Sequence, residues 1–198
     1  MSQILPKAFF EHEDVVSLAK QLIGKQLNTQ IDGVFTSGII TETEAYAGQG
    51  DKACHAHLGK FTKRTKVMYE PGGVAYVYLC YGIHHLFNIV TNTEGHADAI
   101  LIRAIEPTNG IQDMMKRRQK KKQDKTLTAG PGNMTQAMGI TKKHNEQSIA
   151  GDEIWIEDRG LVIDSIVETT RVGIDYAEED AELLWRFYDK NSKYISVK

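Results

Sequence analysis

The segment from Gln26 to Tyr46 constrains the fold more than any other part of the chain. Its pattern predicts two strands joined at Asp32-Gly33, a dipeptide favoured in tight β-hairpin turns. In the second strand Glu42, Glu44 and Tyr46 alternate by two, so their side chains should share one face of a sheet. Burying an unpaired carboxylate is costly, and this face is therefore expected to line a polar cleft.

The remaining elements follow from hydrophobic periodicity and turn residues. Apolar residues at helical spacing predict a first helix from Phe10 to Leu27, and a second hairpin is expected around Gly82. We expect strands at residues 74–81, 86–91, 99–105 (ended by Pro107), 154–157, 161–172 and 184–187. Helices are expected at the start of 111–125 and at 134–138. Residues 47–73 should form an irregular segment with one short helix.

Hairpins surrounded by a few helices, without a regular strand-helix-strand alternation, predict the α+β class. With 198 residues, 41% of them hydrophobic, the chain fits a single domain spanning residues 1–198. No apolar run is long enough to span a membrane, and the first ten residues lack the apolar stretch of a signal peptide. Cys54 and Cys80 form no Cys-x-x-Cys motif, so we expect a reduced, cytoplasmic protein.

The charge is unevenly distributed, although the net charge is only −2. Residues 1–150 carry 18 basic against 14 acidic side chains, whereas residues 151–198 carry 6 against 12. Seven basic side chains lie between Lys116 and Lys125, and this run could contact a DNA backbone or form a solvated loop. Ordinary surface charge and a loop are the favoured interpretations.

The residue types between Glu42 and Asn88 suit the cleavage of an N-glycosidic bond. That transition state resembles an oxocarbenium ion, which a carboxylate stabilises while it deprotonates the attacking water. An alkylated purine already carries positive charge and leaves readily, so one carboxylate suffices. Aromatic side chains hold a flat, cationic ring well, and the sequence Tyr76-Val-Tyr-Leu-Cys-Tyr-Gly82 supplies three of them.

Several motifs in a fixed order resemble the 3-methyladenine DNA glycosylases of the alkyladenine (N-methylpurine) type. The resemblance runs from about residue 7 to the C-terminus. It rests on Glu42-Thr-Glu-Ala-Tyr46, His55, Tyr76-Val-Tyr-Leu-Cys-Tyr-Gly82, Asn88, Leu101-Ile-Arg-Ala-Ile-Glu-Pro107, Gly130-Pro-Gly-Asn, Arg171-Val-Gly and Leu184-Trp-Arg-Phe-Tyr188. It implies one mixed domain with a curved antiparallel sheet, and a monomeric, monofunctional hydrolase that needs no cofactor, no metal and no lyase lysine. Its substrate would be duplex DNA containing damaged purines: 3-methyladenine, 7-methylguanine, and further hypoxanthine and ethenoadenine.

The resemblance also implies a role for each matching position. Glu44 would be the general base, while Arg103 and the backbone carbonyl of Val172 would position the attacking water. The other implied roles concern the flipped base. Tyr46 and His55 would form one wall around it, and Tyr78 would be the opposing ring. Tyr81 would intercalate in its place, and Asn88 would discourage purines that carry a 2-amino group.

Other interpretations remain open at this level. Glu44 could belong to a structural ion pair with Arg103, and the tyrosines could simply pack on a sheet. No histidine shows a zinc-enzyme spacing, and Gly130-Pro-Gly is more typical of a turn before a helix than of a phosphate loop. The chain could be a non-catalytic module that binds damaged DNA, or a hydrolase of free nucleosides. A carboxylate facing DNA argues against the former, and an aromatic wedge at Tyr81 argues against the latter.

Overall fold

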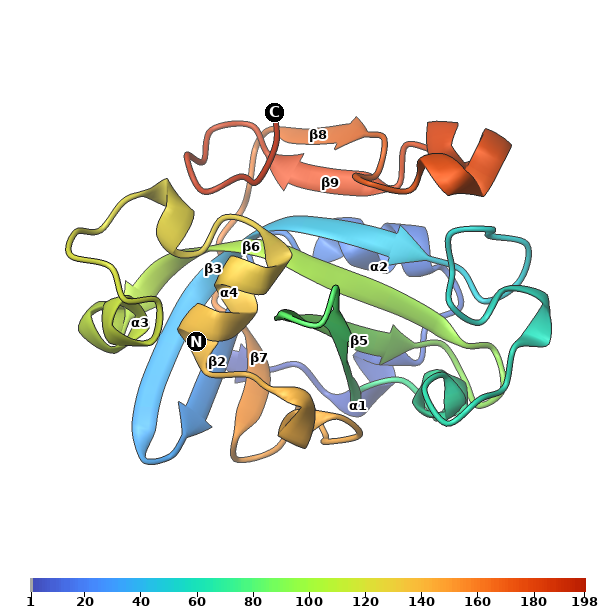
Figure 1. Ribbon diagram of the computed structural model, residues 1–198. Helices are drawn as coiled ribbons and strands as arrows, with labels where there is room; N and C mark the ends of the chain where they lie inside the picture. Colours follow the sequence, from blue (N-terminus) through green and yellow to red (C-terminus); the bar gives the residue numbers. More distant parts are fainter. Residues whose placement is uncertain (1) are drawn as a thin grey trace.

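Two long strands, β3 (Val34–Tyr46) and β6 (Asp98–Asn109), form the centre of the computed structural model, which describes residues 2–198 (Figure 1). Every strand pairing is antiparallel, and the main path through the sheet runs β1-β7-β2-β3-β6-β5-β4. The other strands are β1 (Gln3–Ile4), β2 (Gln26–Ile31), β4 (Ala75–Cys80), β5 (His84–Thr91), β7 (Ile154–Asp158), β8 (Ile166–Thr169) and β9 (Arg186–Asp189). The predicted α+β class with an antiparallel sheet is confirmed.

Strand β3 changes partner half-way along one of its edges. Residues 34–39 pair with β2, and residues 42–44 pair with β9, which in turn pairs with β8. The ladder with β6 is irregular at the same place, because Ile40 and Glu42 face consecutive β6 residues and Thr41 is left over. Such a bulge bends a strand and redirects its side chains. It places Glu42 and Glu44 where the sheet divides.

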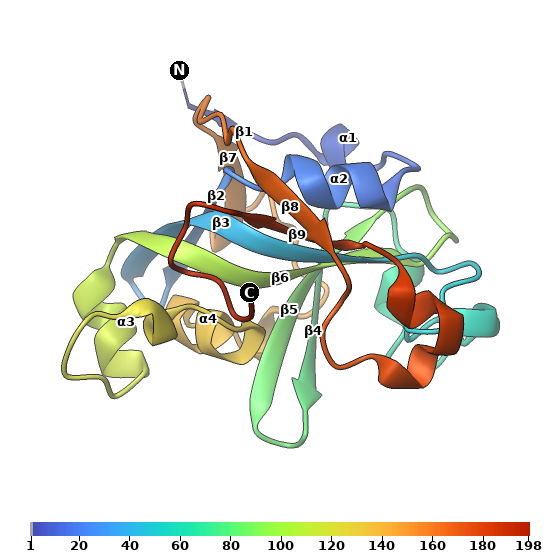
Figure 2. The ribbon, with the colours of Figure 1, turned by 90° about the horizontal axis from the view of Figure 1, so that it is seen from above.

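Helices cover both faces of the sheet (Figure 2). The helices α1 (Lys7–Phe10) and α2 (Val15–Gln21) lie on one face, and α3 (Ile111–Arg117) and α4 (Pro131–Met138) lie on the other. Thr43 on β3 donates a hydrogen bond to the Ala19 carbonyl of α2, at 2.8 Å. The main apolar core includes Leu18, Leu22, Ile40, Phe87, Ile100, Ile102, Met134 and Met138.

Both predicted hairpins are confirmed. Asp32 and Gly33 have φ values of 53° and 76°, the left-handed pair that a two-residue hairpin turn requires. In the second hairpin Cys80 pairs with His84, and Tyr81 and Gly82 again have positive φ, of 50° and 73°. Tyr81 is therefore at the tip of the β4–β5 hairpin, where its side chain is 91% exposed.

The predicted helix from Phe10 to Leu27 is wrong. Two shorter helices replace it, and Asp14 begins the second one by accepting a hydrogen bond from the Ser17 amide at 2.9 Å. Gly24 has a φ of 89°, which stops helical geometry before β2 begins at Gln26. Periodicity alone ran through both boundaries because the apolar residues on either side of them also belong to the core.

Three predicted strand boundaries also differ. Pro107 does not end β6, because it pairs with Gly38 at an irregular step of the ladder, where a missing N–H is tolerated. The strand predicted at 161–172 is restricted to β8, and β9 begins at Arg186 rather than 184. The segment 47–73 contains two 3₁₀ helices, η1 (His57–Gly59) and η2 (Lys66–Tyr69); the others are η3 (Lys125–Leu127), η4 (Lys142–His144) and η5 (Asp175–Glu182).

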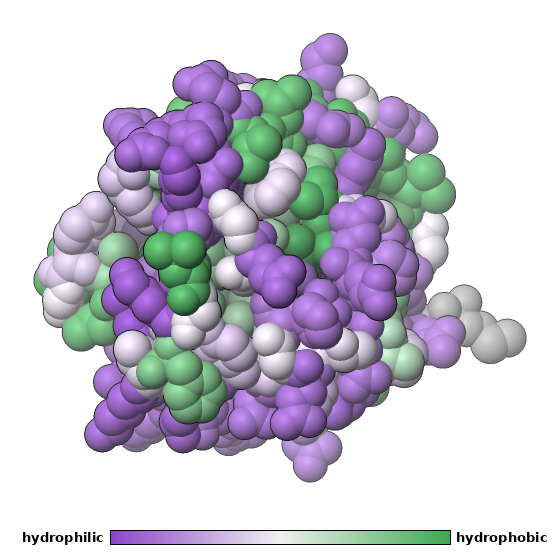
Figure 3. All heavy atoms as spheres, turned by 90° about the vertical axis from the view of Figure 1, so that its right-hand side faces the viewer, coloured by the Kyte–Doolittle hydropathy of each residue, from purple (hydrophilic) through white to green (hydrophobic). Residues whose placement is uncertain are grey.

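The side of the molecule that carries segment 47–73 and η5 is largely hydrophilic, with apolar side chains scattered among polar ones (Figure 3). Within residues 2–198, no helix is long and apolar enough to cross a membrane.

Candidate active site

A cavity of about 550 Å³ opens where the β4–β5 hairpin, β3, β6 and two loops meet. It has a polar floor and a mostly aromatic wall. It contains all eight predicted site residues, Glu44, Tyr46, His55, Tyr78, Tyr81, Asn88, Arg103 and Val172, together with Arg64, Tyr76, Tyr176 and the start of α4 at Gly130–Asn133. Residues far apart in the sequence thus converge on one site.

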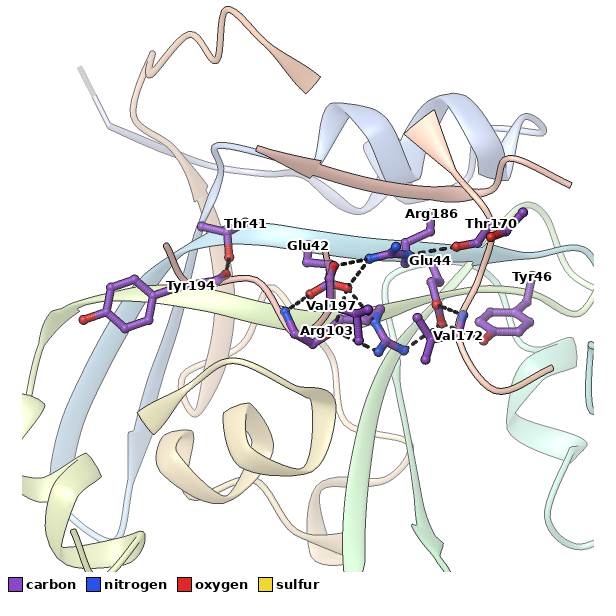
Figure 4. A network of polar contacts seen from close by, with 11 residues as sticks. Thr41, Glu42, Glu44, Tyr46, Arg103, Thr170, Val172, Arg186, Tyr194 and Val197 are labelled. Atoms are coloured by element: carbon purple, nitrogen blue, oxygen red, sulfur yellow. Dashed lines mark hydrogen bonds and ion pairs between the residues drawn. The ribbon is translucent and has the colours of Figure 1, made fainter. Parts of the chain in front are cut away.

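Glu44 forms the floor of this cavity, and its side chain is fully buried. Its Oε2 accepts hydrogen bonds from Tyr46 Oη at 2.8 Å and Arg103 Nη1 at 3.1 Å, and its Oε1 accepts one from the Val172 amide at 2.7 Å (Figure 4). A carboxylate offers about four acceptor positions. One position on Oε1 therefore remains for a further donor.

Glu42 shares the face of Glu44 and Tyr46, as predicted, but it does not line the cavity. It is completely buried, and two arginines bind its Oε1: Arg103 Nε at 2.9 Å and Arg186 Nη1 at 3.0 Å. The Ser196 amide donates to Glu42 Oε2 and the Ser196 hydroxyl donates to Oε1, both at 2.7 Å. The expected polar cleft is thus limited to Glu44 and Tyr46, because the C-terminal segment covers Glu42.

The two carboxylates and two guanidinium groups form a network without net charge. Arg186 neutralises Glu42 and also donates to the carbonyls of Thr170 and Val197, at 2.8 and 2.9 Å. Burial alone would lower the pKa of Arg103, but Glu44 and Glu42 outweigh burial and raise it above its usual value. A buried charge pair is tolerated when hydrogen bonds offset the loss of solvation, and each carboxylate of this network accepts at least three of them.

Tyr46 contributes both a donor and a ring to the site. Burial, and then the adjacent Glu44 charge, raise the pKa of its hydroxyl well above the usual value, so this hydroxyl stays protonated as a donor. The guanidinium of Arg171 lies 4.9 Å from the centroid of its ring. Tyr46 is therefore oriented from both sides, by Glu44 at one end and Arg171 over its face.

A buried ion pair joins the two loops that flank Tyr46. Arg171 binds both oxygens of Asp51, at 2.6 and 2.9 Å, and both side chains are fully buried. Arg171 also donates to the Ala45 carbonyl at 2.9 Å. Because Val172 follows Arg171 directly, this pair holds the amide that contacts Glu44. The predicted water contact of the Val172 carbonyl remains a prediction.

Three rings form the opposite wall. The centroid of the His55 ring lies 4.8 Å from that of Tyr78 and 6.0 Å from that of Tyr76, and both contacts are edge-on. The ring centroids of Tyr76 and Tyr78 are 5.2 Å apart. The sequence grouped His55 with Tyr46, whereas its ring contacts in the structure are with Tyr76 and Tyr78. Burial, and then the charges of Arg64 and Lys60, lower the pKa of His55 to about 4, so its imidazole is neutral at pH 7.

Arg64 was missed by the sequence analysis although it touches all three rings of this wall. Its guanidinium lies 4.6 Å from the centroid of Tyr78, its Nη2 lies 3.1 Å from His55 Nε2, and its Nε lies 3.3 Å from Tyr76 Oη. The same Nη2 lies 3.4 Å from His55 Nδ1, which in turn lies 2.8 Å from Tyr76 Oη, so the three side chains form one polar cluster along the wall. A lone basic residue in an irregular segment gives no sequence signal of such a position.

Two predicted residues occupy the hairpin itself. Asn88 is buried opposite Tyr76, and its Nδ2 donates to the Tyr76 carbonyl at 3.1 Å, which fixes the amide orientation. Tyr81 reaches the rim of the cavity from the exposed tip.

The basic run lies outside the cavity lining. Lys116 pairs with Asp113 at 2.8 Å and Lys120 with Asp124 at 3.1 Å, so nearby carboxylates neutralise part of the charge of the run. The predicted helix after Gly130 is confirmed, since α4 begins at Pro131 and is capped at its C-terminus by Gly139, which has a φ of 77°. Across residues 2–198 no group of three or more His, Cys, Asp or Glu side chains could hold a metal ion.

The chain is similar in sequence to known proteins over nearly its whole length. The family model described as methylpurine-DNA glycosylase matches residues 8–193. The chain belongs to the methylpurine-DNA glycosylase family. It is therefore a DNA glycosylase, a hydrolase of N-glycosyl bonds, and the predicted resemblance and enzyme class are confirmed. The alternative of a non-catalytic binding module is set aside.

Three bacterial relatives are 45–50% identical in sequence to this glycosylase, and each carries the name "Putative 3-methyladenine DNA glycosylase". The relative from Chlamydia felis is 50% identical and covers 93% of this chain and 95% of its own length. That from Alkaliphilus oremlandii is 45% identical, covering 98% and 99%, and that from Clostridium acetobutylicum is 46% identical, covering 95% of each. The eight candidate site residues all lie within the region that the family model matches.

Proposed function

We propose that this glycosylase releases alkylated purines, 3-methyladenine and 7-methylguanine, from duplex DNA and leaves an abasic site. Hypoxanthine and ethenoadenine are further candidate substrates, and the enzyme would act as a monomer without a cofactor. One observation carries the proposal: Glu44 is a buried carboxylate with one free acceptor position, at the floor of a cavity walled by aromatic rings.

In the proposed reaction Glu44 takes a proton from water as the water oxygen bonds to C1′ of the deoxyribose. The C1′–N bond breaks, and its electron pair neutralises the positive charge of the alkylated purine. The negative charge of Glu44 also stabilises the oxocarbenium-like transition state. Arg103 and the Val172 carbonyl are proposed to orient the water. Arg103 also fixes Glu44 through a hydrogen bond of 3.1 Å.

The ring of the flipped purine would lie between Tyr46 and the wall of His55 and Tyr78. A cationic purine gains from the negative faces of these rings, which favours alkylated over intact bases. Asn88 would disfavour a 2-amino group, because the hydrogen bond to the Tyr76 carbonyl leaves its amide little freedom to move. 7-Methylguanine carries this group as well, so we expect its positive charge to offset part of that cost and 3-methyladenine, which lacks the group, to be released faster. Tyr81 would fill the vacated stack, since it is 91% exposed at a hairpin tip that can enter a groove.

Single-turnover base release tests this proposal. Duplexes that carry 7-methylguanine or hypoxanthine would be incubated with excess wild type or Glu44→Gln. We expect the variant to bind the 7-methylguanine duplex normally, because glutamine preserves the shape of the side chain, while release slows at least about 100-fold for lack of a general base. Near-normal release by Glu44→Gln would exclude Glu44 as the base. The contrast between the two lesions in the wild type ranks the substrates.

A further inference from the structure

Arg64 occupies the aromatic wall that the purine would use. Its guanidinium lies over the ring of Tyr78 and also reaches His55 and Tyr76. All four residues line the same cavity. The side chain of Arg64 comes from segment 47–73 and is solvent-exposed, so it can leave the wall without opening the core.

The positive charge of Arg64 is not neutralised by a carboxylate. Among residues 2–198 it forms no ion pair with Asp or Glu, in contrast to the buried arginines 103, 171 and 186. Its contacts are instead with the face of Tyr78, the ring nitrogens of His55 and the hydroxyl of Tyr76, which are weak contacts for an exposed arginine. A second cation on the same wall would meet this charge directly.

We propose that Arg64 competes with the flipped purine for the ring of Tyr78 and thereby lowers the preference of the site for cationic over neutral purines. The inference rests on the proposed function, because it concerns the base that the cavity accepts. Displacing Arg64 costs the same contacts for every purine. Only a cationic purine, such as 7-methylguanine, is also repelled by the guanidinium while both groups share the cavity. Arg64 is thus a specificity-determining residue rather than a catalytic one.

Binding to lesion duplexes tests this competition, in a Glu44→Gln background that prevents base release during the measurement. We would compare the Kd for a 7-methylguanine duplex with that for a hypoxanthine duplex. Arg64→Met keeps an apolar stem but removes the charge, and it should strengthen binding to 7-methylguanine relative to hypoxanthine by roughly 2- to 5-fold, the range of a cation–ring contact at an exposed site. Arg64→Lys keeps the charge and should retain most of the original ratio.

Lys63→Met is the matched control, because Lys63 is an exposed neighbour outside the cavity lining. It removes one positive charge from the same segment and should leave the ratio unchanged. An unchanged ratio in Arg64→Met would overturn the proposal. So would equal weakening on both duplexes with a salt slope reduced by about one, since this marks a phosphate contact. A shifted Kd ratio without base release by the Glu44-containing enzyme would refute the proposed function while supporting the role of Arg64.

Discussion

Replacing Asp51 with alanine tests whether the Asp51–Arg171 pair holds the site together. The Asp51 carboxylate accepts two hydrogen bonds from Arg171, one from the Ala53 amide at 2.9 Å and one from the Ala47 amide at 3.3 Å. Its removal leaves the fully buried Arg171 with only the carbonyls of Ala45 and Asp180 as partners. The substitution therefore creates an uncompensated buried charge.

Loss of one partner from a buried ion pair costs about 3–5 kcal/mol. For a domain of this size, that corresponds to a decrease in Tm of roughly 10 °C. Urea unfolding followed by circular dichroism would measure the change in free energy. The matched control is Glu168→Ala, because Glu168 pairs with Lys20 at 2.6 Å while both side chains are 47% exposed. Breaking this surface pair should cost less than about 1 kcal/mol.

The same variant should also slow base release, because Arg171 precedes Val172, whose amide binds Glu44. Release would be measured at a temperature where Asp51→Ala is fully folded, so that lost stability does not contribute. A loss of stability no larger than that of Glu168→Ala would refute the argument that burial makes this pair important. Full stability loss with unchanged release would show that the pair supports the fold without orienting the site.

Two further predictions concern Tyr81 and His55. Tyr81→Ser should slow base release from duplex DNA more than from single strands, because only the duplex leaves a stack to be filled; equal losses would exclude a wedge. The pKa of His55 is lowered to about 4, chiefly by burial and then by Arg64, so the folded state binds its proton more weakly than the unfolded chain. The free energy of unfolding should therefore fall as the pH drops from about 6.5 to 4. In urea titrations His55→Gln should reduce this fall by about 2 kcal/mol. If the variant and the wild type had the same pH profile, the lowered pKa of His55 would be contradicted.

Local sequence patterns predicted the two hairpins well, because a few adjacent residues specify a tight turn. Asp32-Gly33 and Tyr81-Gly82 adopt the positive φ values of tight turns, and period-two alternation places Glu42, Glu44 and Tyr46 on one face. Element ends were predicted less well. The helix predicted from Phe10 extended beyond Gly24, whose positive φ stops helical geometry. The strand predicted at 99–105 stopped before Pro107, although the β3–β6 ladder tolerates that residue opposite Gly38.

The sequence by itself determined the family, the antiparallel sheet and eight of the residues that line the cavity. Only the tertiary structure decided which of these residues touch each other. Glu42 is buried because Arg186 and Ser196, more than 140 residues away, supply its hydrogen bonds. Arg64 reaches Tyr78, and Asp51 reaches Arg171, through loops whose conformations no periodic pattern encodes. Ion pairs and ring contacts of this kind depend on distances between remote segments, and packing of the whole chain sets those distances.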